Sequence, residues 1–126
     1  MDIKDIQKKI DNIDYCDCKI IDFQINYFGD EVKIVVEGDN KVDFIIKFLK
    51  CYKVEYETDA RSRWKDMEVR SMNKSQLEYF AHDINIKDSE IEGFIEANLE
   101  IPFLFAKIIC KDISIKQVEH NDGNYF

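Results

Sequence analysis

The chain has 126 residues and a net charge of −8, with 45% hydrophobic and 35% charged residues. Four glycines and one proline are too few for collagen-like or low-complexity segments, so we expect one globular domain over residues 1–126. Because phosphate backbones and anionic membranes repel a negatively charged protein, the charge argues against nucleic acids and membranes as partners. An acidic surface suits a basic protein partner; the alternative is that the charge only maintains solubility.

Targeting segments are not visible in the sequence. Residues 1–14 lack the apolar core of a signal peptide, and no apolar run reaches the roughly 20 residues of a transmembrane helix. We therefore expect a cytoplasmic protein whose four cysteines are reduced thiols: Cys16, Cys18, Cys51 and Cys110.

A short amphipathic helix is predicted over residues 1–14. Ile3, Ile6, Ile10 and Ile13 recur at steps of three and four, which places them on one stripe of a helix. An isolated helix of this length is marginal in water, so we expect it to cover a sheet or an exposed sheet edge. Binding of a partner by the same stripe is the alternative.

An antiparallel meander is predicted over residues 19–58. Its first strand, Lys19–Phe28, alternates in a way that places four residues on the buried face: Ile21, Phe23, Ile25 and Tyr27. Two further strands, Val32–Glu37 and Val42–Phe48, follow after short turns that contain glycine and aspartate.

The segment Lys50–Thr58 keeps the strand pattern and either extends the third strand or begins a fourth, with a kink near Lys50–Cys51. The patterns that follow are short. In order they predict a loop, a strand, a capped helix, a strand and a half-exposed strand, over Asp59–Asp66, Met67–Ser71, Ser75–His82, Ile84–Lys87 and Ile91–Leu99.

The most apolar run of the chain is Ile101–Cys110, in which Lys107 is the only charge. A continuous apolar run of this length predicts a strand that is buried on both faces. We expect Ile113–Val118 to continue this strand after a bulge near Lys111–Asp112, and residues 120–126 to fray.

Together these elements predict an α+β fold that is mostly antiparallel β. Its architecture is either a sandwich or a strongly curved sheet, with one or two short helices at the periphery.

Carboxylates are concentrated in the segment Asp83–Glu100, which holds six acidic residues against one lysine. Glu90, Glu92 and Glu96 share strand parity there, so they are predicted to form an exposed acidic row. Such a row suits docking of a basic partner, while a solvated strand face protected against edge pairing is the alternative.

A second candidate binding segment surrounds the only tryptophan. Arg61, Arg63 and Trp64 belong to the residue types that are enriched at binding hot spots. The alternative is that Trp64 packs against one edge of the core.

Catalytic and metal-binding patterns are weak. Cys16 and Cys18 could share a soft metal ion, but no second close ligand pair accompanies them, and free cysteines usually pack as small core residues. His82 and His120 have no nucleophile placed by a recognisable motif, and no glycine-rich phosphate loop is present. We therefore expect no cofactor and no enzymatic activity.

The order of these features carries a resemblance. An N-terminal helix and alternating strands precede Trp64, Val69-Arg70-Ser71, the helix at Ser75–His82 and the strand at Glu90–Leu99. This layout resembles small YxiG-like, immunity-like proteins of low-GC Gram-positive bacteria. The resemblance implies a non-catalytic protein-binding domain that antagonises a basic partner or toxin. One alternative is a structural subunit that self-associates, for which a homo-oligomer is expected. A metal-binding protein or a hydrolase is a less favoured alternative.

Overall fold

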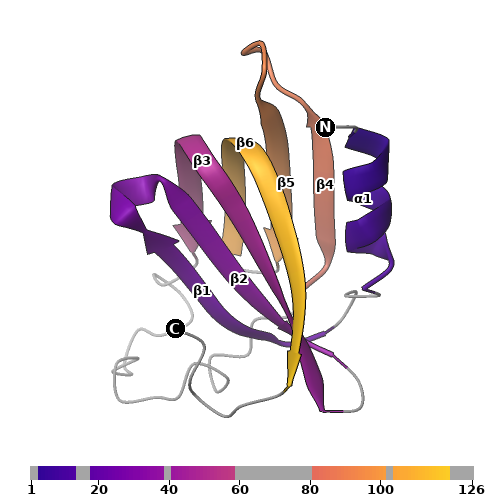
Figure 1. Ribbon diagram of the computed structural model, residues 1–126. Helices are drawn as coiled ribbons and strands as arrows, with labels where there is room; N and C mark the ends of the chain where they lie inside the picture. Colours follow the sequence, from indigo (N-terminus) through magenta and orange to yellow (C-terminus); the bar gives the residue numbers. More distant parts are fainter. Residues whose placement is uncertain (1–2, 14–17, 39–40, 59–80, 102–103, 120–126) are drawn as a thin grey trace, which may run out of the picture.

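The computed structural model describes residues 3–13, 18–38, 41–58, 81–101 and 104–119. In these residues one helix, α1 (Ile3–Asp11), accompanies a six-stranded antiparallel sheet with the order β1-β2-β3-β6-β5-β4 (Figure 1). The strands are β1 (Ile20–Asn26), β2 (Glu31–Glu37), β3 (Val42–Thr58), β4 (Asp83–Asp88), β5 (Ile95–Ile101) and β6 (Leu104–Glu119). The predicted α+β class is confirmed, in its form of a curved sheet with a peripheral helix.

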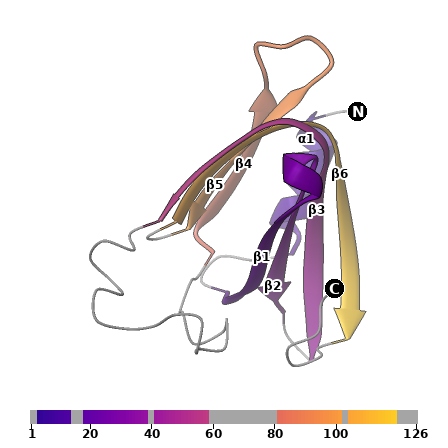
Figure 2. The same cartoon turned by 90° about the vertical axis from the view of Figure 1, so that its left-hand side faces the viewer.

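The long strands β3 and β6 carry the curvature of the sheet, and Figure 2 shows both arching over. At the bend Lys50 has a φ of 55°, and the register with β6 shifts between Cys51 and Lys53. An extra residue on one strand bends it and increases its twist, so the kink predicted near Lys50–Cys51 is confirmed. The bulge predicted at Lys111–Asp112 is wrong, because β6 runs there without interruption.

The bend brings the two halves of the sheet together around one core. Buried residues from both halves, such as Ile34 and Ile46 on one side and Ile84 and Leu99 on the other, belong to a single cluster. The ring of Phe23 on β1 lies 5.9 Å from that of Tyr56 at the far end of β3. One curved sheet therefore encloses a core in the way that the two sheets of a sandwich do.

The first strand differs from its prediction. A register shift between Ile20 and Asp22 interrupts the alternation, and Asp22 is buried. Ile25, further along the strand, is 38% exposed. Tyr27, predicted to point inward, is 74% exposed because the chain leaves the strand there and enters the 3-10 turn η1 (Tyr27–Gly29). A bulge is invisible to a pattern of strict period two, which explains why the burial of Asp22 was not predicted.

The run Ile101–Cys110 is not one strand, which corrects that prediction. Ile101 ends β5 and pairs antiparallel with Leu104, the first residue of β6, so the chain reverses direction between them. Proline cannot donate to a strand ladder, so Pro102 was a stop signal inside the apolar run. The predicted continuation through Ile113–Val118 is confirmed as part of β6.

Helix α1 lies beside the edge strand β4 (Figure 1) and buries Ile6 and Ile10. The side-chain amide of Gln7 donates to Ile84 O at 2.9 Å and accepts from Ile86 N at 2.7 Å. Gln7 thus bonds to the outer backbone groups of β4 as a neighbouring strand would, and the prediction that this helix covers a sheet edge is confirmed.

Several predicted elements lie outside the described residues: the loop Asp59–Asp66, the strand Met67–Ser71, most of the helix Ser75–His82 and the tail after Glu119. The last two residues of that helix, Ala81 and His82, are described and are not helical. β4 begins directly after them and confirms the strand predicted at Ile84–Lys87. No helix in the described part of the chain is long and apolar enough to span a membrane.

Candidate functional site

The acidic row predicted from Glu90, Glu92 and Glu96 does not form. The segment between β4 and β5 is a turn in which the Ser89 hydroxyl lies 2.8 Å from the carbonyl oxygen of Phe94 and accepts the Ile91 N–H at 3.1 Å. Gly93 has a φ of 84°, which glycine adopts without strain. The strand therefore begins at Ile95, and Glu90 and Glu92 lie exposed in the turn, away from Glu96.

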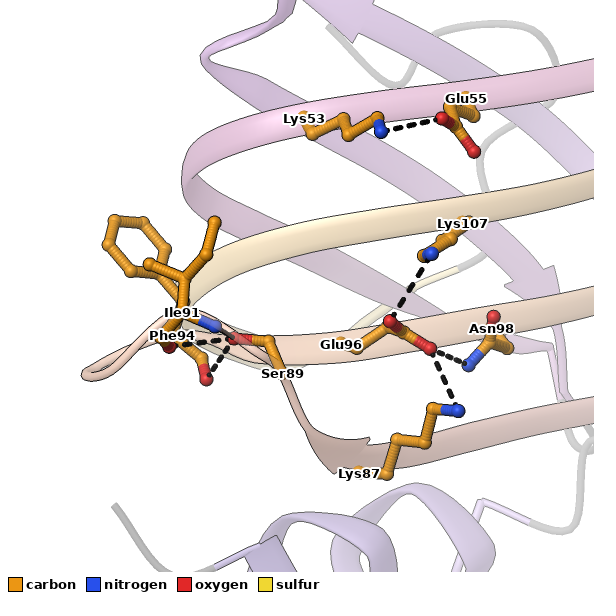
Figure 3. Close-up of polar contacts among 9 residues, drawn as sticks. All are labelled: Lys53, Glu55, Lys87, Ser89, Ile91, Phe94, Glu96, Asn98 and Lys107. Atoms are coloured by element: carbon orange, nitrogen blue, oxygen red, sulfur yellow. Dashed lines mark hydrogen bonds and ion pairs between the residues drawn. The ribbon is translucent and has the colours of Figure 1, made fainter.

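Glu96 is a buried centre of polar contacts on the sheet, only 8% exposed. Its carboxylate accepts a hydrogen bond from Asn98 at 2.9 Å and lies 3.1 Å from Lys87 Nζ and 3.5 Å from Lys107 Nζ (Figure 3). The Asn98 hydrogen bond and the two lysines lower the pKa of Glu96, against the opposing effect of burial. Glu96 therefore holds three strands together and is satisfied within the protein.

The face of the sheet opposite the core, which we call the outer face, presents side chains from four strands in register. On these strands Val54, Ile108 and Ala97 point into the core. Successive side chains of a strand point to opposite faces, so the residues next to these three point outward. The register of β3, β6, β5 and β4 aligns these outward positions in three rows, which are Lys53–Ile109–Glu96–Lys87, Glu55–Lys107–Asn98–Asn85 and Glu57–Phe105–Glu100–Asp83.

The first two rows contain internal ion pairs. Lys53 Nζ lies 2.8 Å from Glu55 Oε1, and this contact raises the pKa of Lys53 and lowers that of Glu55 (Figure 3). This ion pair and the two ion pairs of Glu96 largely balance the positive and negative charges of the two rows. Exposed pairs of this kind contribute little to stability, but they fix the long side chains on the surface.

The third row is different, and we call it the carboxylate row: Glu57, Glu100 and Asp83 around Phe105. All three acidic residues are exposed, and within the described residues none of them has an ion-pairing cation. Asp83 and Glu100 are direct partners across β4 and β5, an arrangement of like charges that destabilises a sheet. Phe105 is 52% exposed on β6, between Glu57 on β3 and Glu100 on β5.

The carboxylate row lines an open hollow of about 400 Å³ on the outer face. Four carboxylates and one cation border the hollow together with an aromatic ring: Glu55, Glu57, Asp83, Glu100, Lys107 and Phe105. An acidic hollow that includes an exposed ring in its lining can accept a cationic side chain, because a guanidinium or ammonium group is attracted by both carboxylates and aromatic faces.

Sequence reasoning missed this row because its members lie far apart in the chain. The signal that was present is the acidic segment Asp83–Glu100, whose two terminal residues both belong to the row. The contributions of Glu57 and Phe105 depend on the pairing of β3 with β6, which no local pattern reveals.

The remaining candidate residues are only partly placed. Arg61, Arg63, Trp64 and Cys16 lie outside the described residues, so their roles stay predictions. Cys18 is a reduced, half-buried thiol that packs against the core. Over the described ranges, no group of three or more histidine, cysteine, aspartate or glutamate residues could hold a metal ion.

A solved structure is similar to this chain in its fold. Among solved structures, the chain is similar to the crystal structure of an uncharacterized protein from Neisseria gonorrhoeae, with a TM-score of 0.51 and 10% sequence identity over 81% of this chain and 92% of that chain. At this identity the similarity shows the fold alone. A search of curated proteins finds no match.

The model of the family described as Immunity protein PIM7 matches residues 2–117, which is most of the sequence. The resemblance to immunity-like proteins is thereby confirmed, while its YxiG-like and Gram-positive details stay predictions. The chain belongs to the PIM7 family of immunity proteins.

Proposed function

We propose that this immunity protein neutralises a protein toxin by binding a basic surface of that toxin on the outer face of its sheet. The observation that supports the proposal is the carboxylate row, in which Glu57 and Glu100 flank the exposed residue Phe105 and Asp83 follows on the next strand. We place this binding in the cytoplasm, as the sequence leads us to expect.

The energetics of the row favour a cationic partner. Asp83 and Glu100 repel each other across neighbouring strands in the free protein, and a lysine or arginine from the toxin would convert this repulsion into attraction. Phe105 adds apolar contact and a face for a guanidinium group, and exposed aromatic rings frequently act as hot spots.

The position of the row also favours binding. Its members are carried by four hydrogen-bonded strands rather than by a loop, so little conformational freedom remains to be lost on association. Inhibition of this kind requires only that the toxin surface be occupied, and it involves no chemical step on the part of the immunity protein.

Cells that express the toxin that the natural protein neutralises provide the test. The double variant Glu57→Lys/Glu100→Lys reverses two charges of the row and should abolish protection. With purified toxin it should weaken binding by about 100-fold or more, because close charge pairs contribute roughly 1.4 kcal/mol or more each.

The matched control is Glu37→Lys/Glu119→Lys, which reverses two exposed glutamates on other parts of the sheet and gives the same net charge. The control should protect cells as the natural protein does. If the row variant protects equally well, the toxin binds elsewhere; if both variants fail, only the overall charge matters and the row has no special role.

Self-association is the alternative function, and the edge strand β1 is the feature that would serve it. β1 is the terminal strand of the described sheet on the side away from α1, and Ile25 on it is partly exposed. Sizing chromatography between micromolar and millimolar concentration separates the two functions: a monomer throughout the range removes this alternative.

A further inference from the structure

We propose that Cys51 and Cys110 are a redox-responsive pair, which oxidises to a disulfide between β3 and β6 at the bend of the sheet. This modification site lies on the inner face and is independent of the toxin-binding surface proposed above. The pair is reduced in the structure.

The positions of the two cysteines fit a disulfide. Cys51 and Cys110 are direct partners in the antiparallel register of β3 and β6. Directly opposed residues in such a ladder have Cα atoms about 4.5–5.5 Å apart, within the range of about 4.4–6.8 Å that disulfides span.

The backbone contacts of Cys51 indicate the closer of the two pair geometries. Its N–H donates to the carbonyl oxygen of Asp30 at 2.8 Å, on the side of β3 that faces away from β6. The two cysteines therefore form a non-hydrogen-bonded pair, in which the side chains of opposed residues approach most closely.

The two thiols lie close enough to influence each other's ionisation. A hydrogen bond between them lowers the pKa of Cys51, while the same interaction and burial raise the pKa of Cys110. In its protonated form the Cys51 thiol donates to Phe48 O at 3.2 Å. Cys51 is half-buried and Cys110 is fully buried, so Cys51 is both the more acidic and the more accessible thiol.

These differences assign the two steps of oxidation by glutathione disulfide. The Cys51 thiolate attacks one sulfur of glutathione disulfide, forms a mixed disulfide and releases one glutathione thiolate. The sulfur of Cys110 then attacks that of Cys51, its proton passes to the departing second glutathione, and the Cys51–Cys110 bond forms. Two electrons pass from the cysteine pair to glutathione disulfide, which becomes one glutathione thiolate and one glutathione thiol; the thiolate takes up the proton that Cys51 lost on ionisation.

The bond formed should be readily reduced again. The Cβ atoms of directly opposed strand residues lie near the upper limit of the disulfide range, and such strain makes a disulfide more reducible. β3 can change its backbone conformation to relieve part of this strain at the bulge next to Cys51, where its register with β6 shifts between Cys51 and Lys53. A reversible bond between two strands at the bend would fix the curvature of the whole sheet.

The test uses the purified full chain, incubated with glutathione disulfide and then alkylated with N-ethylmaleimide under denaturing conditions. Intact mass should show alkylation of two of the four thiols, and peptide mapping should join the peptides of Cys51 and Cys110. Dithiothreitol should restore alkylation of all four. The control variant Cys16→Ser/Cys18→Ser should still form the bond.

The variants Cys51→Ser and Cys110→Ala should form no internal disulfide. In each variant the three remaining thiols should all be alkylated, or one of them should carry a glutathione adduct. Because Cys110 is buried, circular dichroism of its variant checks the fold, and Cys51→Ser supplies the same test at a half-buried position. Alkylation of all four thiols after oxidation of the natural protein, a stable adduct on its Cys51, or a bond to Cys18 would each overturn the proposal.

Discussion

Phe105 is an aromatic residue that the sheet leaves exposed to solvent. Its ring is half-exposed on the outer face, flanked by Glu57 and Glu100. Phe105→Ala should lower the affinity for the toxin at least about tenfold, while the free energy of unfolding falls by only about 1–2 kcal/mol, because about half of the residue is already exposed. Calorimetric titration and urea denaturation measure the two quantities.

The control for this variant is Phe28→Ala, which removes a fully exposed ring from the turn between β1 and β2, distant in the sheet order from β4 and β5. Equal losses of affinity for both variants would contradict a specific role of Phe105.

Glu96 is the residue that links stability to pH. Its pKa is lowered in the folded protein below the unfolded value of about 4.3, so the folded state binds the proton less readily. The resulting stabilisation is complete above the unfolded pKa and is lost as the pH falls through the lower folded pKa. Glu96→Gln should therefore reduce stability by about 1 kcal/mol at pH 7 and make it less dependent on pH below 5.

Urea denaturation at pH 7, 5 and 3 measures this effect, and Glu90→Gln in the exposed turn is the matched control. A Glu96→Gln variant whose stability falls with acid as steeply as that of the natural protein would contradict the assignment.

At the scale of elements, the side-chain amide of Gln7 links α1 to the edge of β4. Gln7 satisfies Ile84 O and Ile86 N on the open edge of β4. Gln7→Ala leaves both partly buried groups without these partners and should destabilise the protein by about 1–3 kcal/mol. Hydrogen exchange of the Ile86 amide should become faster, because its bonding partner is lost.

Lys8→Ala, on the exposed side of the same helix, is the control for loss of a side chain from α1. Unchanged exchange at Ile86 in the Gln7 variant would show that α1 does not protect this edge.

The whole molecule is organised around a bent sheet whose two halves share one core. Ile108 lies on β6, between β3 and β5, and is completely buried in that core. Ile108→Asp should unfold the protein, since an unpaired buried charge is among the most costly substitutions. Ser114→Asp, at an exposed position of the same strand, should remain folded. Circular dichroism distinguishes the outcomes, and a folded Ile108→Asp variant would show that this strand is not central.

Much of the fold could be predicted because the signals are local. The isoleucines of α1, the positions of β2 and β3 and the kink near Lys50 follow from the spacing of neighbouring residues. The errors arose where local spacing misleads. A bulge shifted the pattern of β1, and the apolar run Ile101–Cys110 joined residues of two strands that pair with each other.

The sequence by itself determined an acidic α+β protein with a covering helix and a meander, because residue spacing and composition specify these properties directly. Only the tertiary structure decided which charged groups meet. Glu96, predicted to face a partner, is neutralised by Lys87 and Lys107, whereas Asp83 and Glu100 align beside Phe105. The physical reason is strand register: it joins residues distant in the chain, and a shift of one residue moves every side chain to the other face.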